Sequence, residues 1–146
     1  MSLRRTALLA VTAGAALAVS ACQDAVAETA APVAQAAAPV IDLTVEQLIA
    51  LQATGEIRLI DVRTPEEVAE GMIAGAMHIP LDDLEPAKLD FSDGRKPVFY
   101  CRSGRRSAQA AGRMSEHLGE PVQHLEGGIL AWQEAGQLLA LPEVIQ

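Results

Sequence analysis

Short apolar runs alternate with marked helix starts along most of this 146-residue chain, and this alternation constrains the fold more than any other feature. The runs that suit buried strands are 57–62, 76–79, 97–100 and 122–125. The segments with helical signals are 44–54, 64–70, 107–118 and 129–135, each followed by a glycine. Strands that alternate with helices predict an α/β fold, with a mainly parallel central sheet flanked by helices on both faces. The pattern leaves 81–89 open between a helical turn and a loop.

Two of the predicted helices begin with reciprocal capping residues. Thr44 precedes Gln47 by three residues, which is the pattern of a capping box. Thr64 and Glu67 repeat this pattern, with Pro65 at the first helical position, where the missing N–H has no partner to lose. Both helix starts can therefore be placed from the sequence.

The first part of the chain has the organisation of an export signal. Two arginines precede an uncharged apolar run over 6–19, which is shorter than the about 20 residues that a membrane-spanning helix needs. We therefore expect residues 1–21 to be a signal peptide. The residues before Cys22 resemble a lipobox, in which Cys22 is lipidated and becomes the new N-terminus. The alternative is a cut after Ala27, which would release a soluble periplasmic protein.

The charge of the mature chain limits its partners. Loss of Arg4 and Arg5 with the signal peptide would change the net charge from −8 to −10. Such a protein is a poor match for nucleic acid or for an anionic membrane surface, so only a lipid anchor would hold it to a membrane. The Ala/Pro-rich residues 22–41 predict a flexible linker, and 42–140 the folded domain. The expected location is the bacterial cell envelope, either lipid-anchored facing the periplasm or soluble in the periplasm.

Cys101 has an unusual electrostatic setting for so acidic a chain. It follows an apolar strand and precedes a helix, and the stretch 94–115 holds six basic residues and no acidic one. If the loop amides converge there, they form an anion-binding nest that continues into the helix N-terminus. The amides, the helix dipole and the guanidiniums of Arg102, Arg105 and Arg106 would then lower the pKa of the thiol. The competing interpretation is an inert, buried cysteine.

Four motifs, in this order, resemble the single-domain rhodanese family. They are Asp61-Val-Arg63 with Glu67, Gly71 to Pro80, Tyr100 to Ser107, and Glu126-Gly-Gly128 with Trp132 and Gly136. The resemblance covers 42–136. It implies a rhodanese-like domain that moves a sulfane sulfur from thiosulfate or a similar small anionic donor to a thiophilic acceptor such as cyanide or a thiol. The sulfur would be carried as a persulfide on Cys101.

The resemblance also assigns roles to other residues. The loop that cradles the persulfide would consist of Arg102, Ser103, Gly104, Arg105 and Arg106. Of these, Arg102, and Arg105 as a second candidate, would hold the donor's sulfonate, for which a forked guanidinium is suited.

Supporting roles at the loop and the sheet edge fall to Asp61, Arg63 and Ser107. Trp132 and the glycine pair 127–128 are expected to be packing anchors of the last helix. No metal or organic cofactor is expected. The histidines have no metal-ligand spacing, and no function is assigned to them: His78, His117 and His124.

Loop length separates this chemistry from that of the phosphatases with the same fold. Those enzymes use a cysteine, five residues and then an arginine, whereas position 107 here is serine and the last arginine of the loop is Arg106. A phosphatase or arsenate reductase therefore ranks behind a sulfurtransferase. Two further alternatives stay open: a persulfide carrier that docks on a sulfur-acceptor protein, and a catalytically silent binding domain, which burial of Cys101 would favour.

Overall fold

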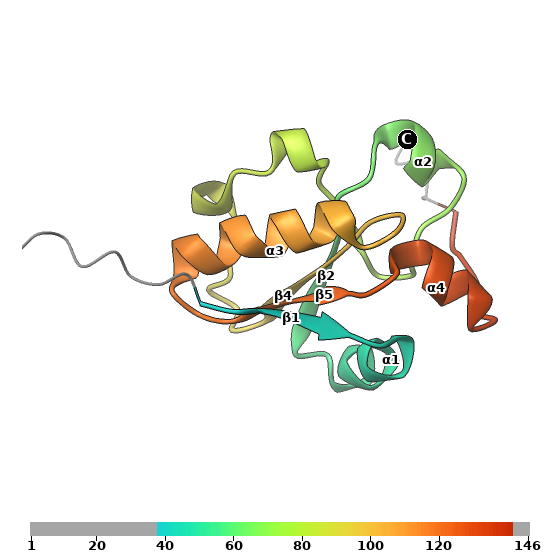
Figure 1. Cartoon of the computed structure of the whole chain (residues 1–146), viewed down its shortest axis with the longest axis horizontal. Coiled ribbons are helices and arrows are strands. Elements are labelled where there is room, and N and C mark those ends of the chain that lie inside the picture. Colours follow the sequence, from blue (N-terminus) through green and yellow to red (C-terminus); the bar gives the residue numbers. More distant parts are fainter. Residues whose placement is uncertain (1–37, 142–146) are drawn as a thin grey trace, which may run out of the picture. The chain divides into compact units, whose positions relative to one another are not determined.

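The central feature of the fold is a five-stranded sheet in which every strand pairing is parallel. The computed structural model describes residues 38–141. The strand order is β1-β5-β4-β2-β3, and Figure 1 shows the sheet with helices on either side. The strands are β1 (Val40–Leu43), β2 (Ile57–Asp61), β3 (Met77–His78), β4 (Lys96–Tyr100) and β5 (Val122–Leu125). The predicted α/β class and parallel sheet are confirmed.

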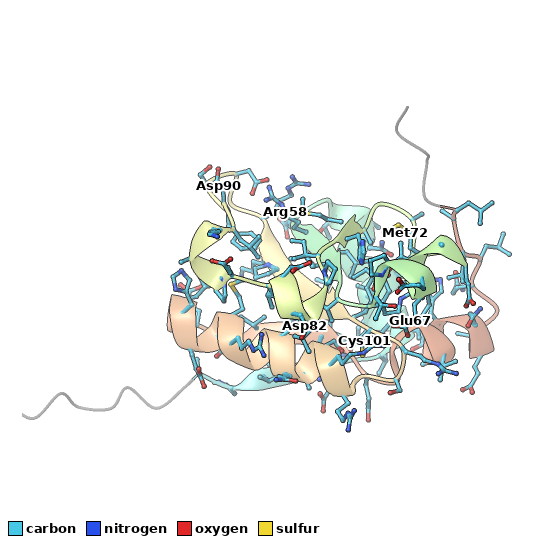
Figure 2. The ribbon with its side chains drawn as sticks, turned by 90° about the horizontal axis from the view of Figure 1, so that it is seen from above. Arg58, Glu67, Met72, Asp82, Asp90 and Cys101 are labelled. Atoms are coloured by element: carbon cyan, nitrogen blue, oxygen red, sulfur yellow. The ribbon has the colours of Figure 1, made fainter. Side chains whose placement is uncertain are left out.

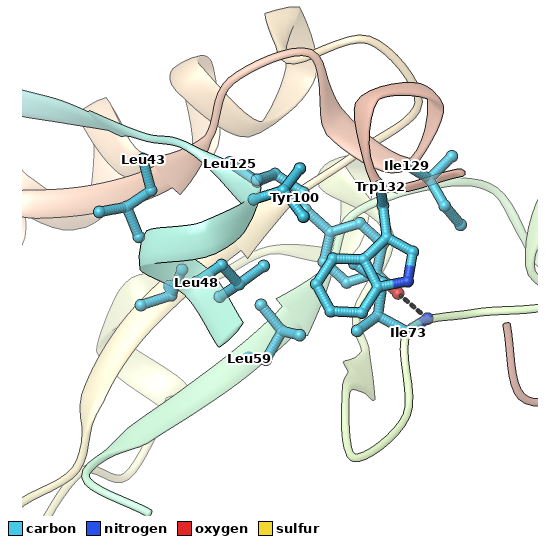
Figure 3. Packing of buried hydrophobic residues seen from close by; sticks show 10 residues of the cluster. Leu43, Leu48, Leu59, Ile73, Tyr100, Leu125, Ile129 and Trp132 are labelled. Carbon is cyan, nitrogen blue, oxygen red and sulfur yellow. Dashed lines mark hydrogen bonds between the residues drawn. The ribbon is translucent and has the colours of Figure 1, made fainter. Parts of the chain in front are cut away.

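Helices cover both faces of the sheet because the three central strands, β2, β4 and β5, bury apolar side chains on both sides. The helices are α1 (Val45–Thr54), α2 (Pro65–Ala69), α3 (Arg105–Leu118) and α4 (Gly128–Glu134). Leu48 of α1 and Trp132 of α4 pack with Tyr100 on one face, where the Tyr100 hydroxyl accepts a hydrogen bond from the Ile73 N–H (Figure 3). Met114 of α3 packs on the other face.

Both predicted capping boxes are present. The Gln47 N–H donates to Thr44 Oγ1 and the Thr44 N–H donates to Gln47 Oε1, at 3.3 and 2.9 Å. Thr64 and Glu67 make the matching pair at 3.4 and 3.1 Å. These local bonds satisfy amides that would otherwise have no partner in the first turn.

An unpredicted strand and an earlier helix start are the main differences from the sequence expectation. Strand β1 was not predicted, and it begins at Val40, inside the stretch assigned to the linker and two residues before the expected domain start. Only Leu43 of its four residues is buried, so the strand has no run of buried apolar residues that a sequence pattern could reveal. Helix α3 begins at Arg105 instead of residue 107. The open segment 81–89 contains two 3-10 turns, η1 (Leu81–Asp83) and η2 (Pro86–Lys88).

The predicted signal peptide, the lipidation site Cys22 and most of the linker lie outside the described residues. Within 38–141, no helix is both long and apolar enough to cross a membrane. The location expected from the sequence therefore stays a prediction.

Candidate active site

The cysteine loop connects β4 to α3 at the carboxyl edge of the sheet, where ligands bind in parallel α/β sheets. Cys101 follows β4 directly, and Gly104 is the N-cap of α3 with φ of 97°, a conformation that favours glycine. This turn directs the Gly104 N–H at Cys101 Sγ, with 3.2 Å between N and S. The thiol therefore lies at the N-terminus of a 14-residue helix, as the sequence predicts.

The surroundings of Cys101 lower the pKa of its thiol. Burial alone raises that pKa, but the N–H and the hydroxyl of Ser107 lower it, as do the amides of Ser103 and Gly104. Among these donors, the Gly104 N–H meets ordinary hydrogen-bond geometry. From the sequence, the guanidiniums of Arg102, Arg105 and Arg106 were also expected to lower this pKa. In the structure the main lowering causes are amides and a serine hydroxyl, while the charge of Cys101 in turn raises the pKa of Arg106.

The first turn of α4 holds the cysteine loop from the other side. The Ile129 N–H donates to the Cys101 carbonyl at 2.8 Å, and the Leu130 N–H donates to the Arg102 carbonyl at 3.2 Å. A Cβ on Gly128 would lie 2.4 Å from the Cys101 carbonyl oxygen, so only glycine allows this approach. From the sequence, this glycine pair was expected to be a packing anchor of the last helix. Its position in the Glu126-Gly-Gly128 motif was the signal for a role at the loop.

The loop arginines differ in what they bind. Arg106 makes two hydrogen bonds to the Glu67 carboxylate, each 2.7 Å long, and this pairing is the main reason that the pKa of Glu67 falls to about 2. Arg102 and Arg105 have exposed side chains, and neither forms an ion pair within residues 38–141. Cys101 and Glu67 can be followed in Figure 2.

Asp61 and Arg63 form a buried ion pair beside the loop. Arg63 Nε lies 3.0 Å from both carboxylate oxygens of Asp61, and Arg63 Nη2 lies 2.6 Å from Oδ2. The same guanidinium donates to the carbonyls of Glu67 and Gly71, at 3.0 and 2.7 Å. With every nitrogen engaged, Arg63 links the end of β2 to α2 and the segment after it. This arrangement is that of a structural brace.

A cleft of about 490 Å³ adjoins the loop. It is lined by Arg63, Glu67, Glu70, Gly71, Arg102, Ile129, Leu130, Gln133 and Leu139. Its charged side comes from α2 and the loop, and its apolar side from α4 and the segment that follows. Within 38–141, no three His, Cys, Asp or Glu side chains gather as a metal site would require.

Burial of Cys101 bears on the inert alternative, because only 1% of the residue is exposed. A structural cysteine in apolar surroundings has a raised pKa. Here the pKa of Cys101 is lowered instead, because hydrogen-bond donors lie around the sulfur. The burial expected of a silent domain is therefore present, but the pKa of the Cys101 thiol is lowered and not raised.

Comparison with known proteins gives a consistent result. The family model for rhodanese-like domains matches residues 44–135. A curated sulfurtransferase from Allochromatium vinosum is 38% identical, and the match covers 64% of this chain and 87% of that protein. Human thiosulfate:glutathione sulfurtransferase is 35% identical over 68% of this chain and 96% of its own length. A solved structure from Rhodopseudomonas palustris, described as a protein of unknown function and possible tyrosine phosphatase, superposes with a TM-score of 0.60 at 31% identity, covering 69% of this chain and 85% of that one.

Proposed function

The chain belongs to the rhodanese-like domain family, and on this premise we propose that it transfers a sulfane sulfur from thiosulfate or a similar donor through a persulfide on Cys101. Sulfurtransferase relatives support sulfur transfer as the general activity and a transferase of this family as the general class. The observation that carries the proposal is the thiol itself. It lies at the N-terminus of α3, where the Gly104 N–H donates to its sulfur at 3.2 Å, and its surroundings lower its pKa despite burial.

The proposed reaction has two displacement steps. The Cys101 thiolate attacks the outer sulfur of thiosulfate, the S–S bond of the donor breaks, and sulfite leaves with the electron pair. The acceptor nucleophile then attacks the outer sulfur of the persulfide, and the Cys101 thiolate leaves. Stabilising the thiolate raises the fraction of Cys101 that is ionised and able to attack, and it makes Cys101 a better leaving group in the second step.

Arg102 is the residue best placed to bind the donor. It lines the cleft, it follows Cys101 directly, and it has no ion-pair partner among residues 38–141. A guanidinium can bind two oxygens of a sulfonate at once. Arg106 is less suited, because Glu67 already occupies its fork.

The acceptor is proposed to be a thiol or cyanide that enters through the same cleft. The name of the human relative, which pairs thiosulfate with glutathione, supports a thiol. The alternative is a persulfide carrier whose acceptor is a partner protein. An enzyme that uses small acceptors should transfer sulfur to a small thiol about as fast as to a protein, whereas a persulfide carrier should transfer it much faster to its partner protein.

A phosphatase is disfavoured by the loop. Position 107, where such an enzyme would place its phosphate-binding arginine, holds a fully buried serine whose hydroxyl donates to the Gly104 carbonyl at 2.9 Å. Arg106 is engaged by Glu67 and is not free to bind an oxyanion. The description of the Rhodopseudomonas structure is the reason to test this activity directly.

The test is thiocyanate formation from thiosulfate and cyanide by the purified chain carrying Cys22→Ser, so that Cys101 is the sole thiol. The matched control adds Cys101→Ser. We expect turnover that the control abolishes, together with a mass increase of one sulfur atom on Cys101 after thiosulfate alone. Absence of both would overturn the proposal, and hydrolysis of a phosphate ester in place of thiocyanate formation would favour the phosphatase.

We also propose export to the bacterial cell envelope, with Cys22 as the lipidated N-terminus. The support is the sequence of residues 1–22. Mass spectrometry of the mature protein distinguishes the outcomes, because lipidation begins the chain at a modified Cys22, whereas the alternative cut begins it at Glu28. An intact N-terminus at Met1 would contradict export.

A further inference from the structure

The apolar side of the cleft beside the cysteine loop comes from two separate parts of the chain. Leu130 lies in the first turn of α4, and Leu139 lies in the segment 137–141 that follows this helix, which we term the C-terminal strap. The charged side of the cleft includes Glu70 and Arg102. A molecule in the cleft therefore meets both apolar and charged groups.

The C-terminal strap is anchored on both sides of Leu139. On one side, the indole N–H of Trp132 donates to the Leu138 carbonyl at 3.2 Å. On the other side, Ala140 forms an antiparallel bridge with Met72, in which each backbone N–H donates to the other residue's carbonyl at 2.8 Å. Because both of its neighbours are hydrogen-bonded to the body of the domain, Leu139 has a fixed position.

Leu138 and Leu139 have different surroundings, although they are neighbours in the strap. Leu138 is 88% exposed and does not line the cleft. Leu139 is half-buried, packs on the core and lines the cleft. It is in close contact with the segment after α2, since a Cβ on Gly71 would lie 3.1 Å from its own Cβ. The strap thus places one leucine in the cleft and the next in solvent.

The size of the cleft exceeds what thiosulfate or cyanide requires. Its volume of about 490 Å³ falls within the about 300–1,000 Å³ of pockets that bind organic molecules. Thiosulfate and cyanide are much smaller than such molecules and have no carbon skeleton that could contact a leucine. The apolar side of the cleft therefore fits a larger, organic molecule.

The cysteine loop forms one boundary of this cleft. Arg102 follows Cys101 directly and lines the cleft, and its carbonyl accepts a hydrogen bond from the Leu130 N–H at 3.2 Å. A molecule in contact with the side chains of Leu130 and Arg102 is therefore adjacent to the loop that carries the sulfur.

We propose that Leu139 and Leu130 determine the acceptor specificity, by contacting the carbon skeleton of a low-molecular-weight organic thiol that has an apolar body. This inference rests on the proposed function, in which the acceptor attacks the persulfide on Cys101. The acceptor thiolate forms a bond to the outer sulfur, the bond between the two persulfide sulfurs breaks, and Cys101 leaves as a thiolate. The two leucines form no bond in this step and act on the binding of the acceptor.

The test compares two thiols that differ in their carbon skeleton, benzyl mercaptan and 2-mercaptoethanol. Cys101 is loaded with thiosulfate in the full chain carrying Cys22→Ser, and loss of the outer sulfur to each thiol is followed by mass spectrometry. The ratio of the two second-order rate constants cancels differences in the amount of loaded protein. We expect this ratio to favour benzyl mercaptan more strongly than the same ratio for the persulfide of free cysteine.

Leu139→Ala should lower the ratio about fivefold and Leu130→Ala about threefold, because each change removes apolar area from one side of a partly open cleft. Leu130 is 42% exposed, so its variant decides the matter if Leu139→Ala does not fold. Leu138→Ala is the matched control. It makes the same change at the exposed neighbour and should leave the ratio unchanged.

Alkylation of Cys101 by iodoacetanilide and by iodoacetamide repeats the comparison without sulfur transfer, because the two reagents differ by a phenyl ring. The variants should fall in the same order. If thiosulfate does not load Cys101, the proposed function fails, and the alkylation ratios decide this inference alone. Ratios that stay unchanged in Leu139→Ala and Leu130→Ala, or that Leu138→Ala lowers equally, would overturn it.

Discussion

At the scale of single residues, the arginines around Cys101 divide by what they already bind. Arg63 and Arg106 are held by the carboxylates of Asp61 and Glu67. Arg102 and Arg105 have no ion-pair partner within the described chain. Arg63 and Arg106 can shape the site, but their guanidiniums are already occupied and have little capacity to bind an anion. Arg102 and Arg105 can bind an anionic donor, and of these two Arg102 lines the cleft.

Replacing Arg102 with alanine should therefore weaken donor binding. We expect the KM for thiosulfate to rise about tenfold, since a hydrogen bond to a charged group contributes about 1.5 kcal/mol. Arg105→Ala removes the same charge from the next turn and should change KM about twofold or less, as expected of an exposed charge. Steady-state thiocyanate formation measures both. Equal effects in the two variants would mean that charge alone, without a specific contact, attracts the donor.

The ion pair between Glu67 and Arg106 should make stability depend on pH in acid. The folded-state pKa of Glu67 is lowered to about 2 from an ordinary value of 4.5. A carboxylate with a depressed pKa stabilises the fold above its unfolded-state pKa, and this contribution is lost as pH falls from 4.5 to 2. Glu67→Gln keeps the capping box while removing the charge.

Urea unfolding between pH 2 and 6 checks this prediction. At pH 6 the free energy of unfolding of the wild type should exceed that of Glu67→Gln by about 1 kcal/mol, a modest value because the ion pair is partly exposed. This difference should vanish near pH 2. Other carboxylates titrate in both proteins and cancel in the comparison. A difference that stays constant with pH would contradict the assignment to this ion pair.

At the scale of elements, two helix starts enclose the cysteine loop. α3 directs amides at the sulfur, and α4 donates two amides to the carbonyls of Cys101 and Arg102. Since a peptide plane carries its N–H opposite its C=O, fixing the carbonyls outward helps to turn the loop amides inward. The close approach of α4 depends on Gly128.

Gly128→Ala should disrupt this arrangement. The new Cβ would lie 2.4 Å from the Cys101 carbonyl oxygen, so the loop or α4 must move. We expect loss of thiocyanate formation and a fall in stability of more than about 2 kcal/mol. Gly119→Ala is the matched control, because Gly119 also has positive φ, 70°, but has open space at its Cβ. It should cost about 1–2 kcal/mol and leave activity intact. Full activity in Gly128→Ala would show that α4 does not position the loop.

The elements also show which parts of the fold a sequence can reveal. Capping residues act within one turn, so the starts of α1 and α2 were predicted from Thr44 and Thr64. The cysteine loop was likewise recognisable, because its residues are consecutive. The contacts that join distant residues were not. Arg106 binds Glu67, which is 39 residues away in the sequence, and His124 contacts Asp42 because β1 pairs with β5.

At the scale of the whole molecule, the residues of the candidate site lie at the carboxyl ends of the strands. The carboxyl ends of β2, β4 and β5 bring together Asp61, Cys101 and the segment that leads into α4. β1 borders this arrangement, and its last two residues are Asp42, which binds His124, and the buried Leu43. The edge strand thus adds Leu43 to the core and holds the buried His124 through Asp42.

Removal of β1 should therefore lower the stability of the fold. A chain that begins at Thr44 loses the strand and the buried Leu43, and we expect it to be at least about 2 kcal/mol less stable than one that begins at Ala38. It also loses the contact between Asp42 and the buried His124. Urea unfolding of the two chains measures the difference. Equal free energies of unfolding would mean that β1 is dispensable to the sheet.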